Sequence, residues 1–560
     1  MPTPSDASGS TLRPLPHSIV VSRGTQLALD AIKNDDERLD NEAISTRILG
    51  SINQEIAVQN AIIENSSMRE ARRSYVSDLD HNAIALTMFR LHPVVNIVPS
   101  VGFRDSDLNL LAIYDDNPES DSYGTYLTSS GDIRRIIRRY NYGITSRGVE
   151  EVMAALSDYA PRVTRTTDPN LVPVKNGVFR RSDKSLIDFS PDMVFISKTN
   201  TAYVEDAPLP VYVDDAGDSW DPESWIKSLT DDAGVPELLW QVIGAVCRPY
   251  ESWNKSAWFY SERGNNGKGT LLELMRHLIG EGNHTSIPIS AFGQEFMLET
   301  LTRAGAILVD ENDVGTYIDK AANLKAVITN DVIMINRKHK APVAFQFYGF
   351  MVQCLNEFPR IRDRSESFYR RQLFIPFTKS FTGAEKRHIK DDYIKREEVL
   401  QYVLHRVLHM DYTEFDEPAA VIGVLDEYKE HNDPIRAFWS DVREEFTWNM
   451  LPLSFLYDLY KAWLQRNSPS ATPVSHINFN RDLRGIVAND DMWVDMGAHR
   501  LRHAGRMSGA EPLINDYDLP APWSDPSASR TNPTNRATPK TLKEKYTALI
   551  RRGHESVGGA

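Results

Sequence analysis

Seven residues that suit phosphate chemistry lie together in a segment that reads GNNGKGT. Backbone amides of a tight loop at a helix N-terminus bind anions, and a lysine there reaches the outer phosphates of a nucleotide. An apolar run at 257–260 precedes the segment and a helical pattern starts near Lys268, which is the order of a phosphate-binding loop. The segment predicts a nucleoside triphosphate site, with a flexible turn before a helix as the alternative. The predicted binding residues are Gly264, Asn265, Asn266, Gly267, Lys268, Gly269 and Thr270.

The loop departs from the usual pattern G-x-x-x-x-G-K-[ST] at two positions. Glu262 stands where the first glycine would fall, and Gly269 stands where a serine or threonine hydroxyl would bind magnesium. Either Thr270, one residue later, supplies that hydroxyl, or water fills the coordination position. The magnesium ligand is therefore the part of this site that the sequence leaves open.

Two further apolar runs end in polar residues that could complete a hydrolytic site. The segment 304–313 carries Asp310 and Glu311, and the segment 350–359 carries Asn356. At the ends of parallel strands, Asp310 would hold Mg²⁺ through water, Glu311 would polarise the attacking water and Asn356 would orient it. The alternatives are a solvated strand end for the acids and a turn before proline for the asparagine.

Two basic clusters could contact phosphates. Arg370 and Arg371 precede an apolar strand pattern, and in a ring ATPase an arginine from the neighbouring subunit neutralises charge on the transferred phosphoryl group. Otherwise such a pair is a solvated face or a carboxylate partner. The segment 324–347 resembles a hairpin with a basic tip, which could reach nucleic-acid phosphates in a central pore or be a plain surface cluster. The tip residues are Arg337, Lys338, His339 and Lys340.

The elements that must position these residues form an alternating α/β core, expected to be a parallel sheet with ligands at the carboxyl ends of its strands. Upstream, the spacing of Ile44, Ile48, Ile52 and Ile56 predicts helices between about 26 and 91. Alternation at 109–116 and 175–192 predicts short strands and hairpins. The region before the core is therefore expected to be mixed and mainly helical.

Downstream of the core, the segments 452–468 and 478–487 predict two amphipathic helices, followed by a strand-like VDMGAHRLRHA. Two helices and a short hairpin suggest a winged-helix module, in which Arg481, Arg484 and Arg500 would contact duplex DNA. A Pro-, Ser- and Thr-rich stretch then predicts a linker, with a short basic helix at 541–552. The predicted domains are a disordered lead (1–17), the mixed N-terminal domain (18–210), a helical collar plus core (211–435), the winged-helix-like module (436–515) and a flexible basic tail (516–560).

Composition limits the class of protein but does not indicate an activity. With 560 residues, 41% of them hydrophobic and 25% charged, the chain suits several globular domains. A formal net charge of -14 argues against a protein that coats nucleic acid with its whole surface, although a local basic channel remains compatible. Only two cysteines occur, Cys247 and Cys354, which excludes a disulfide framework or a cysteine zinc site, and both are expected to be core thiols. Neither a membrane span nor a signal peptide is apparent, so a cytoplasmic location without a membrane partner is expected.

The order of these motifs resembles the helicase part of the phage and plasmid primase-helicase family, which includes the poxvirus-type primase-helicases. The resemblance covers roughly residues 100 to 510 and rests on LVPVKNGVFRRSDKSLIDFSPD, NGKGT, VDEND, LKAVITNDVI, CLNEFP and FYRRQLFIPF, in that order. The sequence is similar to that of a superfamily 3 replicative helicase encoded by a bacteriophage or plasmid.

The resemblance implies an AAA+ type core in a homohexameric ring that uses ATP and Mg²⁺ and unwinds DNA while moving 3′ to 5′ on a single strand. By motif position, Lys268 would be the Walker A lysine, Asp310 and Glu311 the Walker B acids, and Asn356 the sensor. Arg370 or Arg371 would be the arginine finger. Expected partners are single-stranded and forked DNA, replication-origin DNA if the chain is also an initiator, and a host or viral polymerase.

Two other functions remain open from the sequence. The first is a bifunctional primase-helicase, for which FRDSD offers Asp105 and Asp107 but lacks the apolar framing of a primase strand. We therefore expect no primase activity. The second is a nucleotide-gated packaging or assembly ATPase that binds DNA without unwinding it. Strand displacement on a forked substrate separates this function from a helicase.

Overall fold

The computed structural model of the chain divides into two compact units. The first comprises Met1–Val314, Lys320–Glu357 and Arg371–Pro418, and the second Gly315–Asp319, Phe358–Arg370 and Ala419–Ala560. Asp105, Asp107, His339 and Arg500, which the sequence had singled out, lie outside the described residues. The structure describes residues 13–33, 39–65, 70–99, 109–214, 217–312, 318, 321–338, 340–488, 490–499, 501–528 and 531–555.

The N-terminal part of the first unit is mainly helical, as the isoleucine spacing predicted. The helices are α1 (His17–Lys33), α2 (Asn41–Glu64), α3 (His81–Leu91), α4 (Ser130–Tyr140) and α5 (Ser146–Tyr159). Ile44, Ile48, Ile52 and Ile56 lie on one face of α2 and are all buried, because a spacing of four residues keeps side chains on one side of a helix. Asp40 caps α2 by accepting a hydrogen bond from the Ala43 amide.

Strands follow where alternation predicted them. A four-stranded sheet has the order β3-β2-β1-β4, and an antiparallel sheet of three strands has the order β5-β6-β7. The strands of the two sheets are β1 (Val94–Val98), β2 (Leu110–Tyr114), β3 (Tyr126–Leu127), β4 (Arg162–Thr164), β5 (Leu171–Val174), β6 (Gly177–Arg180) and β7 (Ser185–Ile187). A short ribbon, β8 (Tyr212–Val213) with β9 (Ser219–Trp220), leads toward the core.

The core of the first unit is a parallel sheet of five strands with the order β11-β12-β15-β10-β16. Every residue of its four longer strands is buried, which is typical of a parallel sheet covered on both faces. The expected parallel α/β core is thereby confirmed. The strands are β10 (Ser256–Tyr260), β11 (His284–Thr285), β12 (Ala306–Val309), β15 (Phe350–Leu355) and β16 (Gln372–Pro376).

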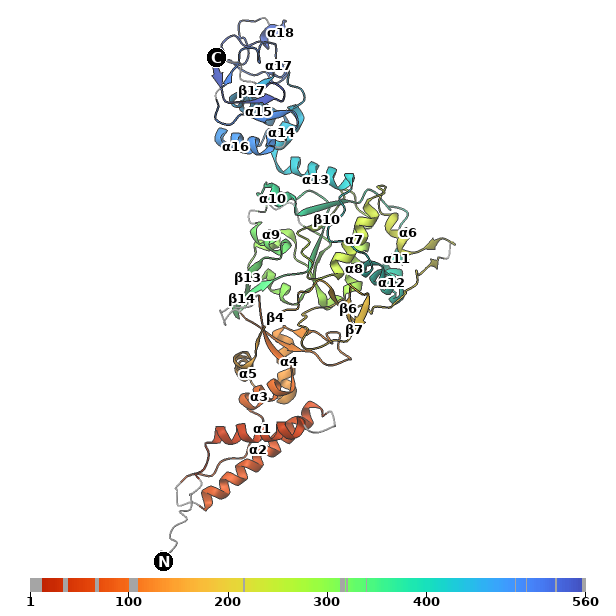
Figure 1. Ribbon diagram of the computed structural model, residues 1–560, viewed down its shortest axis with the longest axis vertical. Helices are drawn as coiled ribbons and strands as arrows, with labels where there is room; N and C mark the ends of the chain where they lie inside the picture. The colour runs from red at the N-terminus through yellow and green to blue at the C-terminus, as the bar shows by residue number, and fades with distance from the viewer. Residues whose placement is uncertain are drawn as a thin grey trace, which may run out of the picture. The chain divides into compact units, whose positions relative to one another are not determined.

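Helices α7, α8 and α12 contact one another beside this sheet (Figure 1). Cys247 at the end of α7 and Cys354 in β15 are buried free thiols, as expected. The helices of the core are α6 (Pro222–Lys227), α7 (Val235–Cys247), α8 (Lys268–Ile279), α9 (Ala322–Ile328), α11 (Arg387–Asp391) and α12 (Glu397–Leu408), with short 3-10 turns η2 (Glu281–Asn283), η3 (Ile289–Gly293), η4 (Met297–Arg303) and η5 (Tyr393–Lys395).

The second unit has its own hydrophobic core, and both helices predicted at 452–468 and 478–487 are present in it. Its helices are α10 (Glu366–Tyr369), α13 (Ala419–Asn432), α14 (Pro434–Val442), α15 (Leu453–Asn467), α16 (His476–Val487), α17 (Pro512–Asp516) and α18 (Pro533–Arg536). Its strands are β17 (Met450–Pro452), β18 (Trp493–Asp495), β19 (Leu501–Arg502), β20 (Lys545–Tyr546) and β21 (Ala548–Arg551).

Two expectations for the C-terminal segment are wrong. The helix predicted at 541–552 is instead strands β20 and β21, because Ala548, Leu549 and Ile550 fill the middle of the sheet β17-β21-β18 and are fully buried. The hairpin predicted after α16 does not form either, since β18 pairs with β21 and β19 pairs with β20.

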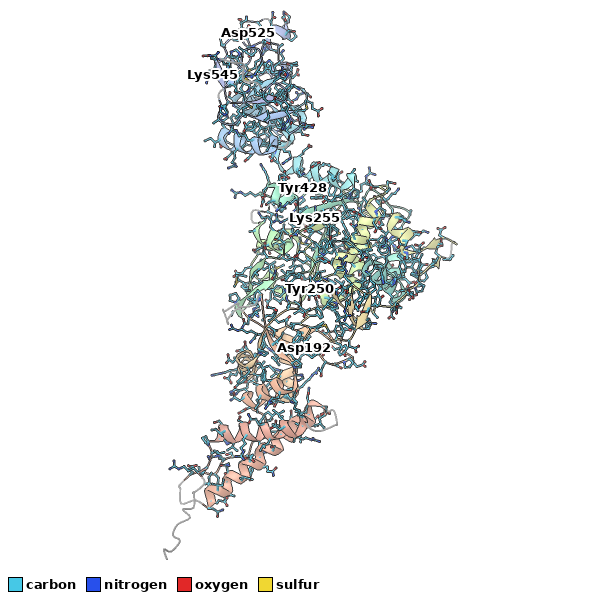
Figure 2. The ribbon with its side chains drawn as sticks, in the orientation of Figure 1. Asp192, Tyr250, Lys255, Tyr428, Asp525 and Lys545 are labelled. Atoms are coloured by element: carbon cyan, nitrogen blue, oxygen red, sulfur yellow. The ribbon has the colours of Figure 1, made fainter. Side chains whose placement is uncertain are left out.

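The flexible basic tail expected from 516 onward is folded over its described residues. Trp523 is buried in the core of the second unit, and its indole N–H donates to Asp458. Asp525 (Figure 2) forms an ion pair with Lys540 and accepts hydrogen bonds from Ser527. This segment therefore supplies core residues and a central strand to the second unit. None of the described helices is long and apolar enough to cross a membrane.

Candidate nucleotide-binding site

The glycine- and asparagine-rich loop connects β10 to α8, as the sequence predicted. Asn265 and Gly267 have positive φ values of 56° and 87°, a conformation that asparagine and glycine tolerate best. A Cβ added to Gly267 would also lie 2.6 Å from Cδ2 of Leu229, so a side chain there would have to displace that methyl group. Asn266 is buried; its side-chain amide donates to the Arg263 carbonyl and its Oδ1 accepts from the Lys268 amide at 3.3 Å. This asparagine thus holds the loop in shape.

Lys268 is buried, and its amine bridges the ends of two strands. It donates hydrogen bonds to the carbonyls of Ser261 (3.2 Å) and Leu355 (3.0 Å) and to Oδ1 of Asn356 (2.9 Å). Burial lowers the pKa of the amine from its ordinary value, although Asp310 opposes that shift. Among the residues that the structure describes, no carboxylate lies within ion-pair distance of it. A buried cation with neutral partners is electrostatically poised to receive an anion.

The sheet order brings the predicted polar residues together. Strand β15 lies between β10 and β12, so the ends that carry Asn356, Lys268 and Asp310 are neighbours along one edge. Asn356 contacts the Lys268 amine directly. Asp310 lies beside the helix start, because a Cβ added to Gly269 would be 3.0 Å from Oδ1 of Asp310. Glu311 follows as an exposed residue. One edge of the sheet therefore holds an amine, an amide and two carboxylates.

The closeness of Asp310 offers a physical reason why glycine, and not serine or threonine, stands at position 269. A side chain at position 269 would bring its Cβ to 3.0 Å from Oδ1 of Asp310, so the carboxylate would have to shift to make room. A carboxylate is the kind of oxygen ligand that Mg²⁺ prefers, so the residues present fit that ion. Thr270 instead lines a neighbouring cavity. The missing side chain at position 269 therefore leaves room for the carboxylate at the end of β12.

A Gly269→Ala variant is expected to need about tenfold more Mg²⁺ for half-maximal nucleotide hydrolysis, because the added methyl group displaces the Asp310 carboxylate. Its thermal stability should be equal or higher, since alanine favours a helix over glycine by up to about 1 kcal/mol. Magnesium titration and thermal unfolding measure the two effects. Gly423→Ala is the matched control, because nothing lies within 4 Å of that added Cβ in α13. An unchanged magnesium requirement would remove Asp310 from the metal site.

Sequence reasoning missed two side chains that fix this edge. Asn312 donates to Oε1 of Gln353 and to the Cys354 carbonyl, both at 3.0 Å, and accepts from the Ile289 amide at 2.9 Å. Gln353 is fully buried in β15 and donates to the Ile287 carbonyl. Together they fasten the end of the acidic strand to its neighbour. A buried glutamine in an otherwise apolar strand is the sequence signal that could have indicated them.

A cavity of about 740 Å³ adjoins the loop beside Gly267 and Thr270. The segment 381–391, which forms one wall, is tied to the loop because the Phe381 amide donates to the Asn265 carbonyl at 2.8 Å. The Asn265 side chain also donates to Glu385. The cavity combines aromatic with charged side chains, among them Trp220, Trp225, Phe381, Lys386, Arg387 and Lys390.

Arg371 lies at the end of the parallel sheet where its strands begin, opposite the end that carries Lys268. It directly precedes β16, and its carbonyl accepts a hydrogen bond from the amide of Ser256, the first residue of β10. The loop of Lys268 follows the last residue of the same strand, and each strand residue adds about 3.3 Å. Arg371 is thus a strand length away from its own Lys268. Arg370 is exposed and belongs to the second unit.

The predicted basic hairpin is present as β13 (Val332–Arg337) and β14 (Lys340–Gln346). Its base is anchored by Arg165, a buried guanidinium that lies over the rings of Phe345 (4.7 Å) and Tyr348 (4.9 Å). Lys338 is exposed in the turn. Of the four predicted tip residues, only Lys338 and Arg337 have side chains that the structure describes.

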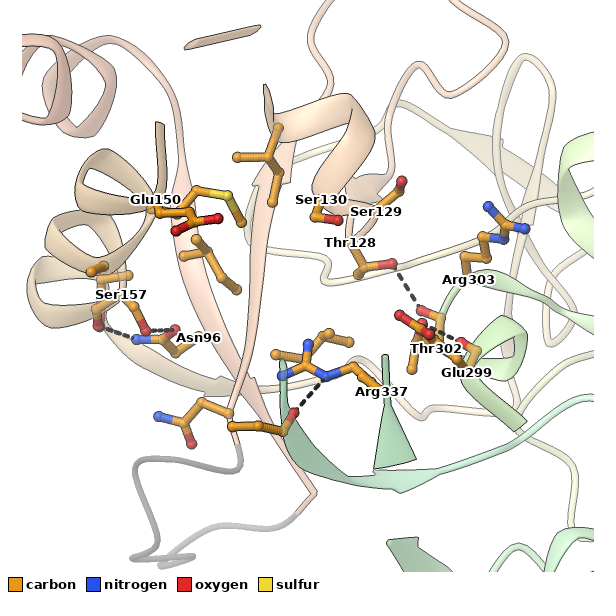
Figure 3. A pocket seen from close by; sticks show the side chains of 18 of the residues that line it. Asn96, Thr128, Ser129, Ser130, Glu150, Ser157, Glu299, Thr302, Arg303 and Arg337 are labelled. Atoms are coloured by element: carbon orange, nitrogen blue, oxygen red, sulfur yellow. Dashed lines mark hydrogen bonds between the residues drawn. The ribbon is translucent and has the colours of Figure 1, made fainter. Parts of the chain in front are cut away.

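Arg337 turns away from the tip into a polar cavity of about 980 Å³ (Figure 3). Its Nε donates to the Ala341 carbonyl at 2.9 Å, and burial lowers its pKa. Glu299 and Arg303 line the same cavity.

Arg481 and Arg484, which were expected to bind duplex DNA, differ in their exposure and in the partners of their guanidinium groups. Arg481 is exposed and pairs with its neighbour Asp482. Arg484 pairs with Asp495 at 3.4 Å and donates to the Gly497 carbonyl at 2.9 Å. The guanidinium of Arg484 therefore holds α16 to the strand that follows it.

The parallel sheet and the loop that opens α8 define a mixed α/β protein whose core is compatible with a P-loop-like fold. Two segments match family models. Residues 259–371, which span the loop and the polar edge, match a family of unknown function (DUF5906). Residues 430–495 match the poxvirus D5 protein-like family, which confirms the resemblance to the poxvirus-type family that the motifs indicated.

Among solved structures the chain is similar to the NrS-1 C-terminal region in its apo form. One such structure has 13% sequence identity and a TM-score of 0.39, covering 76% of this chain and 98% of that chain. Another has 14% identity and a TM-score of 0.38, with 75% and 98% covered. A search of curated proteins finds no match.

Proposed function

We propose that this chain hydrolyses ATP to drive strand separation in DNA, as a replicative helicase of a phage or plasmid. The observation that carries the proposal is the buried Lys268 amine, which has only neutral partners and lies beside Asp310 and Asn356. The phosphates of a bound nucleoside triphosphate would supply the negatively charged partner that the Lys268 amine lacks. The cavity lined by Trp220, Trp225 and Phe381 begins at the same loop and has room for the nucleoside.

Each residue at the polar edge has a separate role in this proposal. Lys268 binds the outer phosphates, and the loop amides surround them. Asp310 holds Mg²⁺, which when bound neutralises phosphate charge. Glu311 accepts a proton from the attacking water, and Asn356 orients that water. Asn312 keeps the acids in position through its bonds to β15.

The finer assignments are also proposals: an AAA+ type core, a homohexameric ring moving 3′ to 5′, and a winged-helix-like module in the second unit. The position of Arg371 supports a ring, because this residue lies a strand length from its own Lys268 and could serve only a neighbouring nucleotide. Lys338 at the exposed hairpin turn would face DNA in the pore, together with its neighbours His339 and Lys340, whereas the Arg337 side chain lines a cavity instead. Origin recognition and contact with a polymerase would complete the replicative role.

Strand displacement from a forked DNA substrate tests the proposal. The full chain with ATP and Mg²⁺ should release the displaced strand, and a non-hydrolysable analogue should not support release. If single-stranded DNA stimulates hydrolysis but no strand is released at any salt concentration, the chain is instead a packaging or assembly ATPase. If no ATP is hydrolysed at all, the assignment of the site fails.

Mixing Arg371→Ala subunits with wild type is expected to reduce hydrolysis more than dilution does. When one defective subunit stops a six-membered ring, an equal mixture retains roughly a few per cent of wild-type activity. Hydrolysis rates across a series of mixing ratios measure this. Arg147→Ala, which removes an exposed arginine of α5, is the control and should leave the mixture unaffected. A linear fall with the fraction of Arg371→Ala subunits would contradict action in trans.

A further inference from the structure

Helix α4, labelled in Figure 1, carries in its sequence a cluster of arginines that the proposed motor does not use. Only one acid, Asp132, lies in this helix, and it pairs with Arg135 at 2.9 Å. The other three arginines have no ion-pair partner among the described residues. The four arginines are Arg134, Arg135, Arg138 and Arg139.

The rest of α4 is fixed firmly to the fold, so its basic side has a defined direction. Ile133, Ile137 and Tyr140 are buried in the core of the N-terminal helices. The Tyr140 hydroxyl contacts Nε2 of His92 at 2.8 Å, and the Ser129 hydroxyl caps the first turn. Arg135, Arg138 and Arg139 are exposed. Arg134 is half-buried, and its Nε has no hydrogen-bond partner in the described structure.

Helix stability alone does not explain this arrangement. Cations in the last turn interact favourably with the helix dipole, which would account for Arg138 and Arg139. However, Arg134 faces Arg138 and Arg135 faces Arg139 at a spacing of four residues, and like charges at that spacing destabilise a helix. The chain has 77 acidic against 63 basic residues, so a helix with four arginines and one acid is a local exception. A ligand that binds the arginines would offset the repulsion.

An exposed aromatic ring lies directly beyond the cluster. Tyr142 follows α4 by two residues and is 89% exposed, the largest exposure among the exposed large hydrophobic side chains of the described chain. Guanidinium groups bind phosphates with paired hydrogen bonds, and a tyrosine ring stacks on an unpaired base. An acidic protein would need only the charges, and a base-paired duplex would leave the ring unused. Both features together fit single-stranded nucleic acid.

We propose that the exposed arginines of α4 and Tyr142 form a docking surface for single-stranded DNA, outside the nucleotide site. The inference rests on the proposed function only in taking DNA as the partner. Arg135, Arg138 and Arg139 bind successive phosphates, and Tyr142 stacks on one base. The surface works without nucleotide, since none of these residues lines the cavity at the loop.

Binding of a fluorescent single-stranded oligonucleotide to the full chain without nucleotide tests the proposal. In Arg138→Gln/Arg139→Gln the dissociation constant should rise about tenfold, and the slope of log K against log salt should be shallower by about 1.4, or about 0.7 per lost phosphate contact. Tyr142→Ala should weaken binding about tenfold through lost stacking, whereas Tyr142→Phe should bind as wild type. Arg23→Gln/Arg72→Gln removes the same charge from other exposed arginines and should have no effect.

The outcomes are distinct. An affinity within twofold of wild type with an unchanged salt slope in Arg138→Gln/Arg139→Gln would overturn the proposal. Loss of binding to phosphatidylserine vesicles with unchanged DNA binding would assign the surface to a membrane and overturn it equally. Hydrolysis of ATP without DNA should be the same in every α4 variant. If the wild type hydrolyses no ATP while these variants lose DNA binding, the motor proposal fails and the docking surface stands.

Discussion

A Lys268→Met variant should hydrolyse ATP at least about 100-fold more slowly than wild type, because it lacks the cation that the loop aims at the outer phosphates. Methionine keeps the length and the buried aliphatic stem of the side chain while removing its charge. Nucleotide at 100 times its dissociation constant should stabilise the wild type by about 2.7 kcal/mol, and this stabilisation should disappear in the variant. Steady-state hydrolysis and thermal unfolding with and without nucleotide measure both effects.

The control for this experiment is Lys395→Met, which removes an exposed lysine from the same unit. Its hydrolysis and its nucleotide-dependent stabilisation should match the wild type. Without nucleotide, Lys268→Met should unfold within a few degrees of the wild type, because a buried charge with lowered pKa contributes little net stability. Normal hydrolysis in Lys268→Met would show that the loop is not the nucleotide site.

A Glu311→Gln variant should bind nucleotide normally and hydrolyse it about 100- to 10,000-fold more slowly, the range expected when a general base is lost. The change is isosteric and lies at an exposed position, so it leaves the packing of β12 intact. Equilibrium binding of a fluorescent nucleotide and single-turnover hydrolysis separate the two properties. The two variants should therefore differ, since Lys268→Met loses binding and Glu311→Gln retains it.

Glu357→Gln is the matched control for Glu311→Gln. It makes the same chemical change at an exposed residue directly after Asn356, on the same edge of the sheet. Its hydrolysis should stay within a few-fold of wild type if Glu311 acts by proton transfer and not by adding negative charge to the edge. Equal losses in both variants would contradict the assignment of Glu311 as the base.

The core could be predicted from the sequence because its signals are local. An apolar strand, a loop rich in residues that accept positive φ, and a helical pattern follow one another around Lys268, and each can be recognised without knowing its neighbours. The acids and Asn356 were likewise indicated by the apolar runs before them. Their meeting at one edge followed from the expectation that the strands are parallel, and the structure has that arrangement.

Other features depend on contacts that a single segment does not reveal. Asn312 and Gln353 meet only because β12 and β15 are adjacent, so neither could be assigned a role from its own segment. Arg337 was expected at a hairpin tip, but its side chain turns into a cavity that includes residues from the N-terminal sheet. The spacing at 541–552 suits an amphipathic helix equally well. This segment forms a strand because β17 and β18 both pair with it, one on each side.

The position of β21 has a consequence for how the second unit forms. Met450 in β17 pairs with Ile550 in β21, so the sheet joins segments a hundred positions apart. Contacts of such long range form slowly, and during synthesis β17 and β18 must wait for β21 to leave the ribosome. Until then both strands present unpaired edges, which attract other chains. Correct assembly of this unit on the ribosome therefore depends on a strand that comes after a stretch rich in Pro, Ser and Thr.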